Sequence, residues 1–578
     1  MNKKSNRLLF FVFITAVMIL ISQLVPYVGA RDRDYYYDIR QNQQLFGQVY
    51  EAICLRYAEV IDPDKFIRAG INGMLSELDP YTVFIEKEDN AELKIMTKGK
   101  YGGLGMRIIK REGFPTVIEP PMVDTPAEKV GIREGDQIIE VDGRSTKKLS
   151  VSETAGFLRG TPGTKVSIKV KRAGEPEPQE FHLIRAVILV RDITYKDIIQ
   201  DSIGYIQLSH FSKDAGREVR QAIQELKLKG MKALILDLRG NPGGLLESAV
   251  AVTENFIPKD ELVVFTKGQM KNSNQEYRSK MQPSWDDGPL VVLVDGGSAS
   301  ASEITAGAIQ DLDRGVIIGS PTFGKGLVQT VVNLGDEADL KITSAKYFIP
   351  SGRLIQKADY FKKSDESVLF FETDSLEDPG DFAEADSEET QVSRVFKTRN
   401  ERIVKEGDGI QPDLLVETPK FNSYRRALEQ KSMFFGFAVE YSAKHPKMAL
   451  NFEVGEPILN EFKKYLKEKE FDYKPAGFSF LEKFEEAMKE EPEQYAGIDS
   501  QILQIKQKVE AAKSHSFDAN LDYVKTRLKT EIAAKIGGTK AKVESTITTD
   551  PVFQNAIETI HQPNKYYSIL HTSGKMGD

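Results

Sequence analysis

Residues 232–257, KALILDLRGNPGGLLESAVAVTENFI, decide the fold of the sequence around them. The stretch opens with an aliphatic run, KALILDL, passes through the loop RGNPGG and continues with apolar residues at helical spacing. A strand that is apolar on both faces is typical of a sheet covered by helices on both sides. The stretch therefore predicts one strand–loop–helix unit of an α/β domain.

The neighbouring sequence repeats this alternation. It predicts a strand and an amphipathic helix at residues 202–211 and 214–230, a strand–loop–helix unit at 289–312, and strands at 315–334. Continuous apolar strands separated by helices indicate a mainly buried sheet. We place this α/β domain at residues 187–420.

Other regions differ in character. Residues 31–95 carry apolar positions at helical spacing and predict a helical region, whereas residues 96–186 combine short β-type runs with glycine turns and predict a small β-barrel. Residues 357–408 form an insertion with a strongly acidic run, which predicts a solvated loop. Residues 421–578, rich in lysine, glutamate and alanine, predict a helical domain. The expected fold class is multidomain, α+β and α/β.

The composition excludes several classes of function. The chain has 578 residues and a net charge of −8, so it lacks the basic surface of a general nucleic-acid-binding protein. Its one cysteine, Cys54, cannot form an intramolecular disulfide, a multi-cysteine zinc site or an iron–sulfur cluster. Its six histidines form no H-E-x-x-H motif. We expect neither a metal nor a cofactor.

The N-terminus has the layout of an export signal. Three basic residues precede an uncharged, mostly apolar run at residues 8–28, and Gly29 and Ala30 end it. The run is long enough to be cleaved as a signal peptide or to remain as a membrane anchor, and the sequence leaves both open. No cysteine lies near Ala30 to accept a lipid of the bacterial lipoprotein type. Residues 1–30 therefore predict export, to the bacterial periplasm or the outer face of the inner membrane.

Three loops of the α/β domain contain residues suited to catalysis. RGNPGG at 239–244 follows a buried strand, and its glycines either form a tight turn or direct backbone N–H groups at a developing negative charge. SASASE at 298–303 lies between a strand and a helix, where a serine is either a helix cap or a nucleophile near the helix dipole. GSPTFGKG at 319–326 comes close to the phosphate loop G-x-x-x-x-G-K-[ST].

The third loop is a poor phosphate site. Gly326 replaces the hydroxyl residue that would hold magnesium, and the strand-like sequence LVQTVVNL follows where a phosphate loop would open a helix. Lys325 is then available for another role, because burial lowers the pKa of a lysine and its neutral amine can act as a general base for a serine. Gln329, four residues further on, lies on the same face and can orient the amine.

A serine, a lysine and a glutamine thus form a candidate catalytic set without histidine. A Ser-His-Asp set would have to use His182 or His210, and neither belongs to a supporting motif. The spacing of the second loop does not select one of Ser298, Ser300 and Ser302.

Within the β-rich region, residues 125–145, TPAEKVGIREGDQIIEVDGRS, resemble a PDZ domain. The preceding YGGLGMRI, residues 101–108, resembles the carboxylate-binding loop of such domains, in which successive glycines let backbone N–H groups converge on an anion. The residues expected to bind a substrate tail are Gly102, Gly103, Leu104 and Gly105.

Taken in order, the motifs resemble those of the carboxy-terminal processing peptidases, which are tail-specific serine proteases with a PDZ domain. The resemblance covers roughly residues 40–355 and residues 409–417, and it rests on the PDZ-like sequence, LRGNPGG, GSASASEITAGAIQD, TFGKGLVQ and YFIPSGRLIQ. It implies that Ser300 is the nucleophile, Lys325 the base and Gln329 its orienting partner.

The same resemblance implies an oxyanion hole made by the N–H groups of Ala301 and of a glycine in the pair Gly243 and Gly244. It also implies that the PDZ-like domain captures substrate tails and gates the protease, with Arg159 as a candidate sensor. The chain departs from the family pattern in its acidic insertion and in the last 150 or so residues, which lie outside the resemblance.

The resemblance implies an exported serine endopeptidase whose partners are protein or peptide substrates with free C-termini. Two alternatives remain open at this stage: a PDZ scaffold or chaperone without proteolysis, and an acyl-transfer enzyme on a related α/β scaffold. The sequence also leaves open whether copies form a homo-oligomer and whether residues 8–28 anchor the chain in a membrane.

Overall fold

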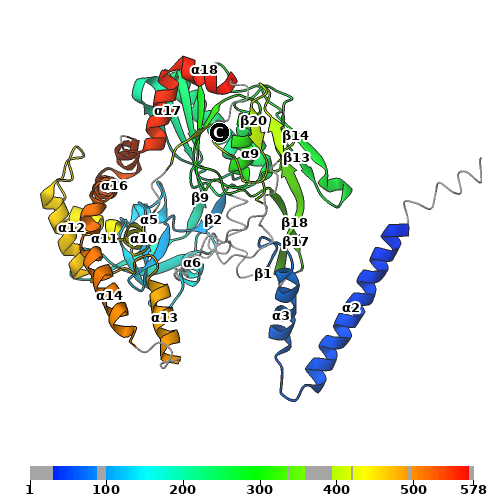
Figure 1. Ribbon diagram of the computed structural model, residues 1–578, viewed down its shortest axis with the longest axis horizontal. Helices are drawn as coiled ribbons and strands as arrows, with labels where there is room; N and C mark the ends of the chain where they lie inside the picture. The colour runs from blue at the N-terminus through cyan, green and yellow to red at the C-terminus, as the bar shows by residue number, and fades with distance from the viewer. Residues whose placement is uncertain are drawn as a thin grey trace, which may run out of the picture. The chain divides into compact units, whose positions relative to one another are not determined.

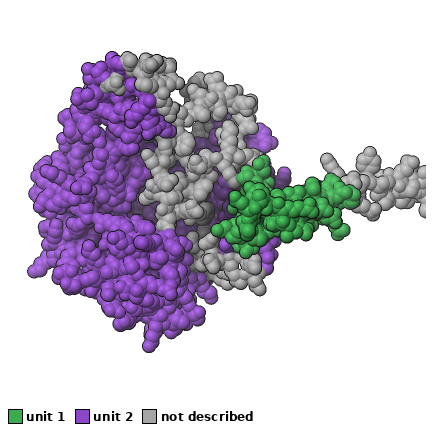
Figure 2. All heavy atoms as spheres, turned by 90° about the horizontal axis from the view of Figure 1, so that it is seen from below, with its two compact units in different colours: residues 1–78 green, residues 79–578 purple. Residues whose placement is uncertain are grey.

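The computed structural model describes residues 30–86, 99–335, 338–357, 394–417, 421–490, 497–547 and 549–571. The chain divides into two compact units, residues 1–78 and residues 79–578, which Figure 2 distinguishes by colour. The apolar run predicted to be a signal or an anchor and most of the acidic insertion lie outside the described residues. In the described ranges, no helix combines the length and the apolarity that a membrane span requires.

The described residues of the first unit form two helices, α2 (Ala30–Arg56) and α3 (Pro63–Ser76), as the apolar spacing predicts. α3 begins at Asp62, whose side chain accepts hydrogen bonds from two backbone N–H groups of the first helical turn. Pro63 follows at the first helical position, where its missing N–H leaves no hydrogen bond unmade.

A β-rich domain opens the described part of the second unit after β1. Its sheet has the strand order β3-β4-β5-β7-β8 with β6 beside β5, and β2 pairs with β9 in a separate ribbon. The bounds are β2 (Lys100–Gly103), β3 (Ile108–Arg111), β4 (Phe114–Val117), α5 (Pro126–Lys129), β5 (Gln137–Val141), β6 (Arg144–Ser145), α6 (Val151–Leu158), β7 (Lys165–Lys171), β8 (Gln179–Ile184) and β9 (Ala186–Leu189). This is the half-open barrel with helices that the sequence predicts, and a single apolar cluster fills it.

The central sheet of the second unit has the strand order β10-β11-β12-β15-β16-β21. Only β10 is antiparallel to its neighbour, β11; the other pairs are parallel. The bounds are β10 (Ile193–Ile199), β11 (Ile203–Leu208), β12 (Ala233–Asp237), β15 (Leu290–Val294), β16 (Val316–Gly319) and β21 (Leu414–Leu415). The aliphatic residues of β12 and β15 are buried, as their continuous apolar sequence predicts.

Helices cover both faces of this sheet. On one face, α7 (Ala215–Leu228), α8 (Leu246–Thr253) and α9 (Ala301–Asp311) belong to the cluster that buries Leu234, Leu236 and Val292. On the other face, α17 (Pro551–His561) and α18 (Pro563–His571) bury Ile235 and Leu293. Figure 1 shows these red C-terminal helices against the green strands. The end of the chain therefore completes the α/β domain.

A second sheet lies within the same unit, with the order β1-β18-β13-β14 and with β17 beside β18. The bounds are β1 (Val83–Glu86), β13 (Leu262–Lys267), β14 (Gln275–Arg278), β17 (Leu327–Asn333) and β18 (Ala338–Phe348). β1 lies inside the region predicted as helical, residues 31–95. Its sequence VFIE is β-branched and aromatic, and pairing with β18 makes it a strand.

The end of the predicted insertion is regular structure. β19 (Val395–Lys397) and β20 (Ile403–Lys405) form an antiparallel hairpin. The guanidinium of Arg402 pairs with the carboxylates of Asp313 (2.6 Å) and Asp413 (2.5 Å), so the hairpin is fixed to the segment after α9 and to the segment before β21.

A helical domain follows at residues 423–547, as the composition predicts. Its helices are α10 (Ser423–Gln430), α11 (Met433–Lys444), α12 (Glu456–Glu468), α13 (Phe478–Glu490), α14 (Asp499–Ser514), α15 (Ser516–Ala519) and α16 (Leu521–Ile547). An aromatic cluster forms its core, and in it the rings of Phe434 and Phe462 stack with centroids 5.3 Å apart.

Phe553→Ala is expected to lower the free energy of unfolding of the α/β domain by about 3–5 kcal/mol, because it removes a buried phenyl ring between α17 and the sheet. Urea unfolding followed by the fluorescence of Trp285, the single tryptophan, measures this change because Trp285 is buried in the same domain. Phe480→Ala, at a residue of α13 that is 53% exposed, is the control and should change the free energy by about 0.5 kcal/mol or less. Equal effects of the two substitutions would contradict the packing described.

Candidate active site

The glycine loop, residues 238–244, leaves the end of β12 and leads to α8. Its conformation requires glycine, since φ is +65° at Gly240 and +99° at Gly243. A Cβ atom at Gly243 would lie 2.8 Å from the backbone nitrogen of Ala301 and 3.0 Å from Cβ of Ser300. The loop therefore packs directly against the start of α9, and only glycine permits that approach.

The three serines of the second loop have different surroundings. Ser298 is buried, and its hydroxyl donates to the carbonyl oxygen of Leu238 (2.8 Å). Ser302 is also buried, and its hydroxyl donates to the carbonyl oxygen of Asn241 (2.9 Å). Both hydroxyls thus hold the glycine loop in place. Ser300 alone of the three is partly exposed.

Ser300 also has an unusual backbone. Its φ is +54° and its ψ is −112°, outside the regions that L-residues favour. Such strain persists only where the surrounding structure enforces it, and it is frequent at catalytic residues. Exposure and strain both single out Ser300, which the spacing of the motif could not do.

Lys325 lies two residues before β17, and its side chain is half-buried. Its Nζ donates to Oε1 of Gln329 (3.3 Å) and lies 4.5 Å from the ring centroid of Tyr81. Burial and, to a smaller extent, the positive charge of Lys341 lower the pKa of Lys325, and the charges of Glu303 and Asp79 oppose them, so that its pKa is about 8. A large share of this amine is therefore neutral at mildly alkaline pH.

A carboxylate joins the serine loop to the lysine loop. The side chain of Glu303, on the first turn of α9, is fully buried. Its Oε2 accepts the N–H groups of Ser300 (2.8 Å) and Lys325 (2.9 Å). Its Oε1 accepts the hydroxyl of Thr322 (2.6 Å) and the N–H of Gly324 (2.7 Å). The loop that resembles a phosphate loop thus cradles a carboxylate of its own chain.

Burial raises the pKa of Glu303 to about 7, although the four hydrogen bonds favour the ionised form. Sequence reasoning missed this residue because glutamate three positions after a helix-capping serine is the ordinary capping-box pattern. No sequence signal places the 322–325 loop on the same carboxylate.

A tyrosine makes a second connection. Tyr347, near the end of β18, is fully buried. Its hydroxyl contacts the carbonyl oxygen of Ser300 (3.2 Å) and the carbonyl oxygen of Lys325. The backbones of the two residues are therefore held together from two sides, by Glu303 on their N–H groups and by Tyr347 on their carbonyl groups.

The predicted oxyanion donors lie next to Ser300. The N–H of Gly243 donates to Oδ1 of Asn241 (2.9 Å) and so already has an acceptor. In the part of the chain that the structure describes, no acceptor is recorded for the N–H of Gly244 or of Ala301. The N–H groups of Gly244 and Ala301 thus remain the candidate donors to an oxygen anion formed at Ser300.

The two histidines considered in the alternative set have other surroundings. His182 lies on β8 of the β-rich domain and is exposed, 3.9 Å from a carboxylate oxygen of Glu180. His210 follows β11, and burial lowers its pKa. Among the described residues, neither ring is recorded in a hydrogen bond with Ser300. Clusters of acidic, cysteine or histidine side chains suited to a metal ion are likewise absent from the described ranges.

The predicted tail-binding loop connects β2 to the segment before β3. Gly103, Leu104 and Gly105 are buried, and φ at Gly105 is +83°. A Cβ atom at Gly105 would lie 2.3 Å from Cβ of Thr125, so only glycine fits there. No acceptor is recorded among the described residues for the N–H groups of Leu104 and Gly105. The loop thus offers buried N–H groups to an anion.

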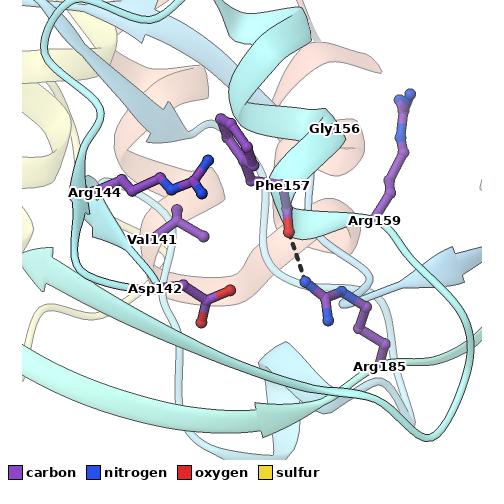
Figure 3. Close-up of a pocket in the computed structure, with 7 residues that line it drawn as sticks. All are labelled: Val141, Asp142, Arg144, Gly156, Phe157, Arg159 and Arg185. Atoms are coloured by element: carbon purple, nitrogen blue, oxygen red, sulfur yellow. Dashed lines mark hydrogen bonds between the residues drawn. The ribbon is translucent and has the colours of Figure 1, made fainter. Parts of the chain in front are cut away.

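Arg159, the candidate sensor, ends α6 beside a cavity of about 320 Å³ in the β-rich domain. Figure 3 shows its side chain extending away from Arg144 and Arg185. Arg185 donates to the carbonyl oxygen of Phe157 (2.7 Å) at the end of α6. The guanidinium carbon of Arg144 lies 5.1 Å from the centroid of the Phe157 ring. Arg159 lies 5.8 Å from the ring centroid of Tyr101, next to the tail-binding loop.

The sequence is similar to known families and proteins. The profile of peptidase family S41 matches residues 202–360, a PDZ domain profile matches residues 117–172, and the profile of the C-terminal helical domain of probable PDZ-proteases matches residues 424–560. The carboxy-terminal-processing protease of Bartonella bacilliformis is 35% identical over 358 residues, which cover 61% of this chain and 80% of the relative. This chain belongs to the carboxy-terminal-processing protease family.

Two further relatives agree. The carboxyl-terminal-processing protease of Synechocystis is 40% identical over 50% of this chain and 68% of its own length. The carboxy-terminal processing protease CtpA of Bacillus subtilis is 34% identical over 61% of this chain and 76% of its own length. The predicted fold class and the assignment as a serine-type protease with a PDZ domain are confirmed. Family membership favours the peptidase over the scaffold and the acyl-transfer enzyme.

Glu303→Gln is expected to reduce kcat of the protease by about 10- to 100-fold. Each carboxylate oxygen of Glu303 accepts two hydrogen bonds, so the NH₂ group of glutamine faces two donors whichever oxygen it replaces. At least two hydrogen bonds to a charged group are therefore lost, at about 1.5–3 kcal/mol each. Steady-state cleavage of a peptide substrate measures the change.

Asp311→Asn is the matched control, because Asp311 is a buried carboxylate of the same helix that pairs with Arg353 (2.9 Å) and bonds to neither loop. Both variants should lose stability, and only Glu303→Gln should lose kcat in the folded protein. A wild-type kcat for Glu303→Gln would show that the loops align without the carboxylate.

Proposed function

We propose that this protease is an exported endopeptidase that cleaves peptide bonds with Ser300 as nucleophile and Lys325 as general base, after its PDZ domain has bound the C-terminal tail of the substrate. One observation carries the catalytic part: the partly exposed serine of its motif has a strained backbone that is tied, through Glu303 and Tyr347, to the backbone of a half-buried lysine.

In the acylation step, the neutral Nζ of Lys325 removes the proton from the hydroxyl of Ser300 as its Oγ attacks the scissile carbonyl carbon. The oxyanion accepts hydrogen bonds from the N–H groups of Gly244 and Ala301. Gln329 holds the lysine amine through its side-chain carbonyl, which accepts one amine hydrogen and directs the amine's orientation.

In the next step, the protonated Lys325 donates its proton to the leaving amine, and the carbon–nitrogen bond breaks. A water molecule then attacks the acyl-enzyme with Lys325 again as base, and the acid product leaves while Ser300 recovers its proton. The pKa of about 8 suits both directions of this transfer, since it lies near physiological pH.

The PDZ domain supports the proposal of tail recognition. A substrate carboxylate on the N–H groups of Leu104 and Gly105 would tether the chain and raise the local concentration of its scissile bond at Ser300. Protein or peptide substrates with free C-termini are therefore the proposed partners. Arg159 is proposed to sense the bound tail, since it lies between the tail-binding loop and α6.

Export is proposed from the N-terminal sequence alone. The basic residues and apolar run at 1–30 favour the bacterial periplasm or the outer face of the inner membrane. Mass spectrometry of the mature N-terminus distinguishes a cleaved signal from a retained anchor.

Ser300→Ala and Lys325→Met are each expected to abolish cleavage of a peptide substrate, and the wild-type rate should rise with pH through a midpoint near 8. The sign follows because only the neutral amine is a base, so the active fraction grows as the pH passes the pKa of Lys325. A pH–rate profile of kcat/KM measures it. A midpoint near 6.5, typical of histidine, would contradict the assignment.

Lys341→Met refines the same test. The positive charge of Lys341 lowers the pKa of Lys325, so its removal should move the midpoint of the pH–rate profile to higher pH. An unchanged midpoint would show that burial alone sets the basicity of Lys325.

A peptide with a free C-terminal carboxylate is expected to bind at least about tenfold more tightly than the same peptide with a C-terminal amide. The amide has no negative charge for the N–H groups of Leu104 and Gly105 to bind. Gly105→Ala should abolish the preference, since its Cβ atom would overlap Thr125. Gly113→Ala is the control: φ is +82° there, yet nothing lies within 4 Å of the added Cβ atom. Isothermal titration calorimetry gives the affinities, and equal binding of acid and amide peptides would refute tail capture.

A further inference from the structure

Near its start, the glycine loop carries an arginine, Arg239, which has one partner nearby in the chain and one far away. The guanidinium of Arg239 donates to both carboxylate oxygens of Asp237, with Nη2 at 2.7 Å from Oδ2 and Nε at 3.0 Å from Oδ1. Its Nη1 donates to Oδ2 of Asp550. The side chain of Asp237 is 2% exposed and that of Asp550 is 13% exposed, so water competes little for these contacts.

Asp550 occupies a defined position between two helices. It follows α16 and caps α17, because its Oδ1 accepts the N–H groups of Val552 (2.9 Å) and Phe553 (3.4 Å). One oxygen thus fixes the helix start and the other fixes Arg239. The position of Asp550 in its ion pair with Arg239 is therefore fixed by the start of α17.

The packing of α17 reaches the same network from a second direction. The ring of Phe553 contacts the ring of Tyr205 edge-on, with centroids 5.2 Å apart. The hydroxyl of Tyr205 donates to Oδ2 of Asp237 (2.8 Å). Both carboxylates that hold Arg239 are accordingly positioned by contacts with α17.

The loop needs such support because of its own sequence. Residues 239–244 contain three glycines, which have the largest conformational entropy to lose when the loop is ordered. Besides Arg239 and the hydroxyls of Ser298 and Ser302, the loop is held by Oδ1 of Asp295 on the N–H of Gly240 (2.8 Å) and by the side chain of Asn241, which donates to the carbonyl oxygen of Leu208 (2.7 Å). The bond from Arg239 to Asp550 adds a support from the C-terminal part of the chain.

The domain that precedes Asp550 also holds the PDZ domain. Lys535 of α16 pairs with Glu134, in the turn before β5. Arg111 of β3 lies over the ring of Phe435 on α11 at 3.7 Å from its centroid. One helical domain thus contacts the tail-binding module, and the residue that follows it contacts the glycine loop.

We propose that Asp550 is a positioning residue for catalysis: it fixes Arg239, and through Arg239 the backbone N–H groups of the glycine loop, so that the C-terminal helical domain sets the geometry of the oxyanion hole. This inference rests on the proposed function, because it assumes that Gly244 stabilises the oxyanion formed at Ser300. Without Asp550, the loop samples conformations in which the N–H of Gly244 is not aimed at that oxygen.

The test uses the full chain with Asp550→Asn. Asparagine keeps a side-chain oxygen that can accept hydrogen bonds at the start of α17, as the side chain of Asn422 does at the start of α10. It removes the negative charge that pairs with the guanidinium of Arg239. The expected result is a kcat about tenfold lower with KM within twofold of wild type, since an oxyanion contact is made in the transition state. The rate at which a fluorophosphonate labels Ser300 should fall in parallel, and Asp550→Glu should restore part of kcat.

Glu429→Gln is the matched control, because Glu429 forms a similar pair with Arg527 (2.6 Å) inside the helical domain and touches no part of the glycine loop. Both substitutions should lower Tm, and only Asp550→Asn should lower kcat. An equal loss of kcat in Glu429→Gln, or a wild-type kcat in Asp550→Asn, would overturn the inference.

If Asp550→Asn does not fold, Arg239→Lys provides the same test from the other partner, since lysine keeps the charge but cannot bridge both carboxylates. It should lower kcat and leave KM unchanged, and an unaltered kcat would overturn the inference. Cleavage that persists in Ser300→Ala would instead refute the proposed function, so the two failures are distinguishable.

Discussion

The carboxylate of Glu303 is the interaction on which the arrangement of the active site depends. It is buried and accepts four hydrogen bonds, from the serine loop on one side and from the lysine loop on the other. Neither loop is regular secondary structure, and the strands that carry them cannot fix their tips. A single buried carboxyl group fixes both, because each hydrogen bond left unmade in a low-dielectric interior costs more than it would in water.

Much of the fold follows from the sequence, because the central sheet is built from continuous apolar strands with helices between them. The β-rich domain and the helical domain were also predicted by composition and turn signals. The strand β1 was not, since four residues, VFIE, carry too little periodicity to be separated from the helices before them. The sequence likewise could not show that α17 and α18 pack against the central sheet, because the apolar face of a helix does not indicate which surface it covers.

At the candidate active site, the residue types were predictable from the motifs, and the spacing alone did not choose among the serines. Lys325 and Gln329 followed from the departures of residues 319–326 from a phosphate loop and from the separation of the two residues by four positions. Ser298, Ser300 and Ser302 are equivalent in spacing, and the family resemblance selected Ser300; in the structure, its partial exposure and its backbone distinguish it from the other two. Glu303, Tyr347 and Asp550 act through contacts between segments that are far apart in the chain, so no local pattern could reveal them.

The helices α17 and α18 make the central sheet depend on contacts between residues that are far apart in the chain. The hydroxyl of Tyr566 bonds to the backbone of Leu290, a residue 276 positions earlier. Contacts of this kind form slowly in folding, because the closure of a long loop costs entropy before the contact stabilises the chain. One apolar face of the sheet therefore stays uncovered until α17 and α18 have packed against it, and a fragment without residues 551–571 would expose that face.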